Sequence, residues 1–253
     1  MMAHEPASPG EPLQTADPRA VAIVTGIQLG DERAVQRWLV EHPSLATVRI
    51  VDEHGVARSL LHVAADWPGH YPNVASIVRV LIAAGADPNA ALRPADPAGA
   101  PETPLHWAAS SDDVNLIDAL LDGGADIDAP GAVFTGGTAM SDAVVFAQFH
   151  AARRLLERGA STTLWQAAAL GLAERVTAWC DATPAPSHEE ITNAFWHACR
   201  GGQQITAALL LERGADINWV GHDHKRPLDA AHDSGDHDLM IRLESNGGTR
   251  LRG

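Results

Sequence analysis

Residues 103–113, TPLHWAASSDD, gather the kinds of side chain that hydrolases use. They include the imidazole of His106, the hydroxyls of Ser110 and Ser111, and two adjacent carboxylates. Imidazoles and carboxylates can transfer protons, and a serine activated by such a base can attack a carbonyl carbon. The segment is therefore either an active site or one copy of a repeated scaffold.

The rest of the chain contains further copies of this segment. Its start recurs as SLLHVAA, TAMSDAV, TTLWQAA, NAFWHAC and RPLDAAH, and the end of a unit recurs as AAGADPN, DGGADID, ERGASTT, ERGADIN and SNGGTRL. The gap between the end glycines Gly159 and Gly214 is longer than the others, and we interpret it as a short unit plus a normal one. Such self-similarity predicts a stack of small, similar units.

The residues of one copy explain how it would fold. Thr103 can cap a helix, and Pro104 suits the first helical position because its missing N–H group costs nothing there. Leu116 and Leu120 belong to the apolar stripe of a second helix, which Gly124 ends in a left-handed conformation. Two short antiparallel helices result, and neither buries its apolar face alone. Neighbouring units must therefore stack.

These motifs resemble the ankyrin repeat family, whose signature is a TPLHxAA helix start and a GADxN turn. The resemblance implies an all-α solenoid of about seven helix-turn-helix units with short β-hairpin fingers. It covers residues 18–248, between a disordered leader at 1–17 and a tail at 249–253. The prevalence of Ala, Arg, Asp and Gly suggests a bacterial source with GC-rich DNA. We place the units at about 18–47, 58–91, 102–130, 137–163, 162–182, 191–219 and 225–248.

The resemblance assigns structural roles to His62 and His106, whose rings would bond backbone groups near the helix starts. It also predicts a hairpin finger over residues 47–59. Two insertions depart from the family pattern, an extra loop at 68–72 and a long, proline-rich finger at 90–102.

Other residues of each unit should face the concave surface. In the family these are the residue before the two alanines and the two residues after them. Together with the 68–72 loop, this mapping predicts a binding surface of Asp66, Trp67, His70, Tyr71, Trp107, Ser110, Ser111, Asp142, Phe146, Gln166, His197 and Arg200.

Two functions compete for this surface. Exposed aromatic residues and arginine dominate protein interfaces, which favours a module that binds a partner protein. Alternatively, the 68–72 and 90–102 insertions close a pocket for a small molecule, in which Asp66, His70, Asp142 and His197 would act as general acids and bases. No nucleophile elbow, phosphate loop or metal-ligand spacing accompanies these residues, so we expect no cofactor and no metal and favour the binding module.

Charge, cysteine content and the N-terminal sequence indicate which partners and which cellular location to expect. The formal net charge of −14 disfavours nucleic acid and anionic membrane. The two cysteines form no disulfide framework, and the N-terminal sequence lacks the apolar core of a signal peptide. We therefore expect a cytoplasmic protein.

Overall fold

Helices arranged in consecutive antiparallel pairs make up most of the chain. A computed structural model describes residues 11–96 and 98–251, and these contain the seven helix pairs expected from the repeats. The first helix of each pair is called inner here, and the second outer. The pairs are α1 (Pro18–Leu29) with α2 (Glu32–Glu41), α3 (Leu60–Ala65) with α4 (Val74–Ala83), α5 (Pro104–Ser110) with α6 (Val114–Asp122), α7 (Ala139–Val145) with α8 (Phe149–Glu157), α9 (Leu164–Ala169) with α10 (Ala173–Cys180), α11 (His188–Arg200) with α12 (Gln204–Glu212), and α13 (Pro227–Ser234) with α14 (His237–Ser245).

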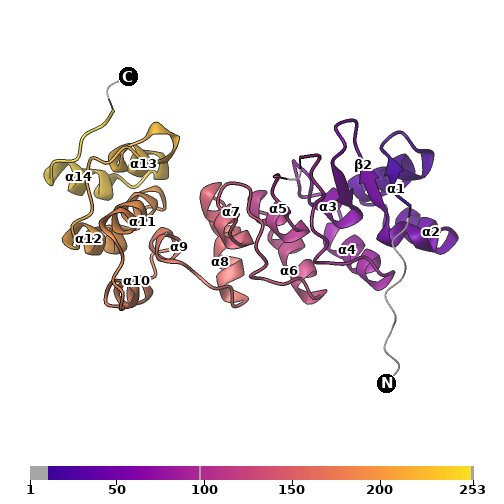
Figure 1. Cartoon of the computed structure of the whole chain (residues 1–253), viewed down its shortest axis with the longest axis horizontal. Coiled ribbons are helices and arrows are strands. Elements are labelled where there is room, and N and C mark those ends of the chain that lie inside the picture. Colours follow the sequence, from indigo (N-terminus) through magenta and orange to yellow (C-terminus); the bar gives the residue numbers. More distant parts are fainter. Residues whose placement is uncertain (1–10, 97, 252–253) are drawn as a thin grey trace. The chain divides into compact units, whose positions relative to one another are not determined.

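The chain divides into two compact units, Met1–Ala160 and Ser161–Gly253, called the N-terminal and C-terminal units below. Figure 1 shows the helix pairs of each unit following one another in chain order. No helix of the described residues is long and apolar enough to cross a bilayer. The all-α repeat architecture expected from the sequence is confirmed.

Local sequence explains the third pair. Thr103 adopts an extended N-cap conformation and Pro104 starts α5, as expected. Asp113 caps α6 by accepting a hydrogen bond from the N–H of Leu116 at 3.0 Å. Gly124 follows α6 with φ of +93°, a conformation that residues with a Cβ rarely adopt.

Stacking between neighbouring pairs forms the core of each unit. In the N-terminal unit α5 packs against α3 and α7, while α6 packs against α4 and α8. Ala108 and Ala109 are fully buried in the inner layer, and Leu116 and Ile117 are fully buried in the outer one. Alanine lets the inner helices approach closely, and the leucine and isoleucine side chains fill the wider space between inner and outer layers.

A small sheet closes the start of the N-terminal unit. Strand β2 (Arg49–Val51) pairs antiparallel with β3 (Ala57–Ser59), which confirms the hairpin expected at 47–59. Strand β1 (Leu13–Gln14) pairs with β2 in parallel and buries Leu13. Residues 11–17 therefore do not form the disordered leader expected there, because Leu13 finds an apolar site, while residues 1–10 lie outside the described residues.

The C-terminal unit is built on α11, which packs against both α9 and α13. Its core includes Phe195 and Trp196, which are fully buried, and Leu210 from α12. A short 3-10 turn, η2 (His222–His224), lies in the finger between α12 and α13. Another 3-10 turn, η1 (Pro43–Thr47), follows α2 in the N-terminal unit.

Enlarging a stacking alanine should destabilise the N-terminal unit. Ala108→Leu places extra methyl groups where α5 is fully buried, and we expect a loss of about 1–3 kcal/mol in the free energy of unfolding. Urea denaturation followed by circular dichroism measures it. Ala83→Leu, at an exposed position of α4, is the matched control and should change stability by less than about 0.5 kcal/mol. Equal effects of the two substitutions would contradict the stacking account.

Candidate functional site

The histidines of the repeat motif belong to the scaffold. His106 Nδ1 accepts a hydrogen bond from the backbone N–H of Thr103 at 3.1 Å, and its Nε2 donates to the carbonyl oxygen of Gly137 at 3.3 Å. His62 repeats the arrangement with Ser59 and with the carbonyl oxygen of Glu102. Each ring thus ties a helix start to the finger that follows, as the resemblance implied. Burial lowers the pKa of His62 to about 4, so its ring is neutral at physiological pH.

The serines that looked like nucleophiles are not activated. The hydroxyls of Ser110 and Ser111 both donate to the carbonyl oxygen of Trp107 at 2.9 Å. A serine nucleophile needs a base that accepts its proton, and a backbone carbonyl cannot do so. Both serines lie at the end of α5, half-buried, where they support the helix end.

Asp66 lies at a small cavity in the N-terminal unit. Its carboxylate forms an ion pair with Arg58 at 2.5 Å, and the two residues line a cavity of about 180 Å³ with Val63 and Ile50. Tyr71 lies near Asp66; burial and the Asp66 charge raise the pKa of its hydroxyl, which also bonds Gln28. The ion pair with Arg58 thus holds the Asp66 carboxylate at the cavity wall.

The inserted loop at 68–72 packs on the neighbouring repeat. His70 Nε2 donates to the carbonyl oxygen of Ser111 at 2.9 Å, and the backbone N–H of His70 donates to Asp113 at 3.0 Å. The loop therefore lies against the end of α5. Trp67, which precedes the loop, remains 85% exposed.

A pair of carboxyl groups lies beside Trp107. Asp142 on α7 is 1% exposed, and one of its carboxyl oxygens has no hydrogen-bond partner among the described residues. Burial and the nearby charge of Glu102 raise the pKa of Asp142 to about 7, against a hydrogen bond from the N–H of Val133. Burial also raises the pKa of Glu102, although that carboxylate accepts a hydrogen bond from the indole of Trp107 at 3.3 Å.

Glu102 is a site residue that sequence reasoning missed. It immediately precedes the TPLH motif, where family mapping expects a finger end and assigns no role. Only the fold of the finger shows that its carboxylate comes near Asp142. The long finger at 90–102 accounts for this placement, since its ends are joined by the hydrogen bond from Leu92 N–H to the Glu102 carbonyl oxygen at 2.6 Å.

Phe146 forms an exposed aromatic pair with a residue that was also missed. Its ring centroid lies 5.8 Å from that of Phe134, in the finger that precedes α7. Phe134 is 70% exposed and Phe146 is 40% exposed. The neighbouring Val133 is exposed as well. The sequence signal was the AVFTGG stretch, an apolar finger tip where polar residues are usual.

In the C-terminal unit, Gln166 is not a surface residue. It is 2% exposed, and its side-chain oxygen accepts a hydrogen bond from the N–H of Thr163 at 2.8 Å, which completes a capping box at the start of α9. This is the role of His106 in α5. The expectation that Gln166 lies on the binding surface is therefore wrong. Helix α9 starts at Leu164, so Gln166 is its third residue and occupies the position that His106 has in α5.

His197 is enclosed by aromatic rings. Its centroid lies 4.6 Å from Trp165, 5.0 Å from Trp196 and 5.4 Å from His222. Burial, with smaller contributions from the neighbouring His222 and Arg200, lowers the pKa of His197 to about 3. The ring is therefore neutral at physiological pH and cannot donate a proton as a general acid.

The finger between α12 and α13 folds against α11. The carbonyl oxygen of Lys225 accepts a hydrogen bond from the indole of Trp196 at 2.9 Å, and Arg200 forms an ion pair with Asp223 at 3.2 Å. Arg200 is half-buried, with its guanidinium 5.6 Å from the Trp196 ring centroid. His222 is exposed, and its ring lies edge-on to that of Trp196, with 5.3 Å between the ring centroids.

The proposed acid–base set is not assembled within the N-terminal unit. Asp66 pairs with Arg58, His70 bonds Ser111, and Asp142 is influenced by Glu102. The fourth member, His197, belongs to the C-terminal unit. The part of the chain that the structure describes contains no group of three or more His, Cys, Asp or Glu side chains able to hold a metal ion.

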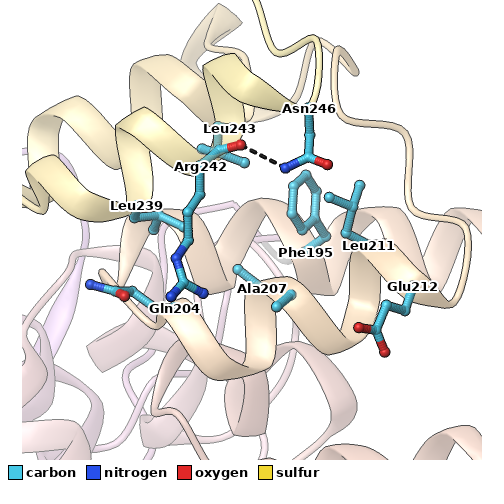
Figure 2. Close-up of a pocket in the computed structure, with 10 residues that line it drawn as sticks. Phe195, Gln204, Ala207, Leu211, Glu212, Leu239, Arg242, Leu243 and Asn246 are labelled. Carbon is cyan, nitrogen blue, oxygen red and sulfur yellow. Dashed lines mark hydrogen bonds between the residues drawn. The ribbon is translucent and has the colours of Figure 1, made fainter.

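A second cavity lies on the outer side of the C-terminal unit, where the sequence predicted nothing. Figure 2 shows side chains from α12 and α14 around Phe195. The cavity measures about 330 Å³. The available signal was α12 itself, QITAALLLE, which is apolar on every side instead of on one stripe.

Neutralising Asp142 should stabilise the N-terminal unit at alkaline pH. The folded pKa of about 7 lies above the ordinary value of 3.8, so the folded protein holds a proton that the unfolded chain has lost. Stability should fall as pH rises from about 4 to 7. Asp142→Asn should remove this dependence and raise the free energy of unfolding at pH 8 by about 2–4 kcal/mol. Chemical denaturation over a pH series measures it; Glu53→Gln, at an exposed position, should leave the wild-type profile unchanged.

His197 should have the opposite effect at acidic pH. Its folded pKa of about 3 lies below the ordinary value of 6.5, so acid protonates the unfolded chain first. Stability of the C-terminal unit should fall as pH drops from about 6.5 to 3. His197→Phe keeps a ring among the tryptophans and should reduce this loss by about 1 kcal/mol or more at pH 5. The exposed His188→Phe serves as the control, and an unchanged acid profile for His197→Phe would contradict the burial account.

A comparison with protein families agrees with this geometry. A family model described as ankyrin repeats (3 copies) matches residues 61–164, from the second helix pair to the start of the fifth. Beyond the C-terminal end of that match, capping boxes recur at α11 and α13, and glycines with positive φ, Gly214 and Gly247, follow α12 and α14. Residues 61–164 thus match the ankyrin repeat family.

Proposed function

We propose that the N-terminal unit binds a partner protein through the ends of its inner helices. Ankyrin repeats are generally protein–protein interaction modules, which gives the general class of function. The binding face proposed here consists of Trp67, Trp107, Phe134 and Phe146, with Ser110 and Ser111 between them.

The exposed aromatic side chains carry the proposal. Trp67 is 85% exposed at the end of α3, and the Phe134–Phe146 pair is exposed at the end of α7. Large apolar side chains in water are unfavourable by about 25 cal/mol per Å² of exposed apolar surface, so a partner that covers them gains that free energy. Tryptophan is also enriched among the residues that dominate binding energies.

Polar groups around the aromatic residues would add specificity. Glu102 stands beside Trp107, and Asp66 and Arg58 form an ion pair close to Trp67 in sequence. An apolar centre with a charged rim is the usual arrangement of a protein interface. The half-buried Arg200 of the C-terminal unit is a further residue of the kind that interfaces favour.

Small-molecule catalysis receives less support from the geometry. The cavity beside Asp66, at about 180 Å³, is smaller than the roughly 300–1,000 Å³ of typical ligand pockets. Asp66 and His70 each have a structural partner, and the serines donate to backbone. We therefore favour recognition over catalysis at this face.

A cytoplasmic setting in a bacterium forms part of the same proposal. Cys180 and Cys199 are both free thiols, and burial raises the pKa of Cys199 beyond its ordinary range. Reduced cysteines are typical of proteins inside cells. The bacterial source rests on amino-acid composition alone.

Removing the exposed aromatic side chains should abolish partner capture. In a pull-down from the source organism's lysate, wild type should retain a discrete protein that Trp67→Ala/Phe134→Ala/Phe146→Ala does not. Binding of the purified partner should weaken at least about a hundredfold, since each hot-spot residue contributes about 2 kcal/mol or more. Titration calorimetry then measures the affinity.

A matched variant keeps the experiment specific. Val40→Ala removes a side chain that is 80% exposed but lies on the outer helix α2, away from the ends of the inner helices. It should capture the partner as wild type does. If both variants and wild type retain the same proteins, or if only the control loses capture, the proposed face is wrong.

A further inference from the structure

The outer side of the C-terminal unit presents an unusual amount of apolar surface. Ile205 on α12 is 72% exposed and Ile241 on α14 is 61% exposed. Ile205 lies on the same face of its helix as Ala208 and Glu212, three and seven residues further on. A helix that is apolar all round is usually buried on all sides, whereas α12 has one side uncovered in this chain.

The sequence neighbours of these isoleucines, Gln204 and Arg242, line the 330 Å³ cavity between α12 and α14. Phe195 is among the residues lining it, and Leu211, Leu239 and Leu243 line its walls. It exists because α12 and α14 pack together less closely than α4 and α6 do. The space is large enough for a branched aliphatic side chain such as isoleucine.

Two opposite charges stand on the rim of the cavity. Arg242 lies beside Gln204 on one side, and Glu212 lies on the other (Figure 2). Neither has an ion-pair partner among the residues that the structure describes, although the adjacent Arg213 pairs with Asp181 at 3.1 Å. A surface of this kind therefore offers one free cation, one free anion and an apolar centre.

Such a surface is complementary to itself. In a two-fold symmetric dimer the same patch is used by both copies, so each residue meets a different residue of the partner copy. A two-fold axis passing between Arg242 and Glu212 brings each guanidinium against the other copy's carboxylate. It also brings the apolar regions of the two copies, which include the exposed isoleucines and the cavity wall, against each other. A partner of a single charge would leave one of the two rim charges unpaired or repelled.

We propose that this outer face, formed by Ile205, Glu212, Ile241, Arg242 and the cavity between α12 and α14, binds a second copy of the chain. The interaction is separate from the partner face of the N-terminal unit. Opposite charges select the two-fold arrangement, and burial of the isoleucines and the cavity wall supplies the free energy.

Charge reversal tests the pairing directly. Sedimentation velocity over a wide concentration range should show a reversible monomer–dimer equilibrium for the full chain. Glu212→Arg alone and Arg242→Glu alone should each raise the dissociation constant at least about tenfold, because like charges then face each other. An equimolar mixture of these two variants should regain dimers, since each copy then supplies the charge that the other needs.

Two further variants test whether the effect is specific to the proposed face. Ile205→Asp should also weaken the dimer, whereas Glu244→Arg, an exposed reversal elsewhere on α14, should leave it at wild-type strength. All of these positions are on the surface, and matching circular dichroism spectra would show that the variants fold. A wild-type monomer at every concentration would overturn the proposal. So would a dimer that neither reversal weakens, or a mixture of the two reversed variants that stays monomeric.

Discussion

Contact between neighbouring helix pairs is the interaction on which the rest of the structure depends. A pair of short helices cannot enclose an apolar core, so each pair becomes stable only when its alanines and leucines meet those of the next. Ala108 and Ala109 are fully buried for this reason. His106 then joins its helix start to the carbonyl oxygen of Gly137 in the following finger. Packing and polar bonding thus act across the same boundary.

That requirement leaves particular positions free for function. Residues needed for stacking are buried and small, whereas residues at the ends of the inner helices and at the finger tips do not pack in the core. Trp67, Phe134 and Phe146 occupy such positions. Aromatic side chains that are exposed to water contribute nothing to the stacking of helix pairs. Their exposure is therefore not explained by the scaffold, and it points to recognition instead.

Buried polar groups show how far the surroundings change a side chain's chemistry. Asp142 and His197 look like an acid and a base in sequence, yet burial raises the pKa of Asp142 to about 7 and lowers that of His197 to about 3, so both side chains are neutral near pH 5. Burial disfavours whichever form is charged, so it raises the pKa of a carboxyl group and lowers that of an imidazole. We therefore expect both residues to make the stability of their units depend on pH.

The sequence by itself determined the repeat, the helix pairs and the roles of His62 and His106, because these depend on motifs that are local and recur. Only the tertiary structure decided that Gln166 is a cap, that Glu102 lies near Asp142, and that Leu13 joins the first finger. It also revealed the cavity between α12 and α14. These features arise from contacts between segments distant in sequence and from small shifts in helix start and spacing, which no local motif encodes.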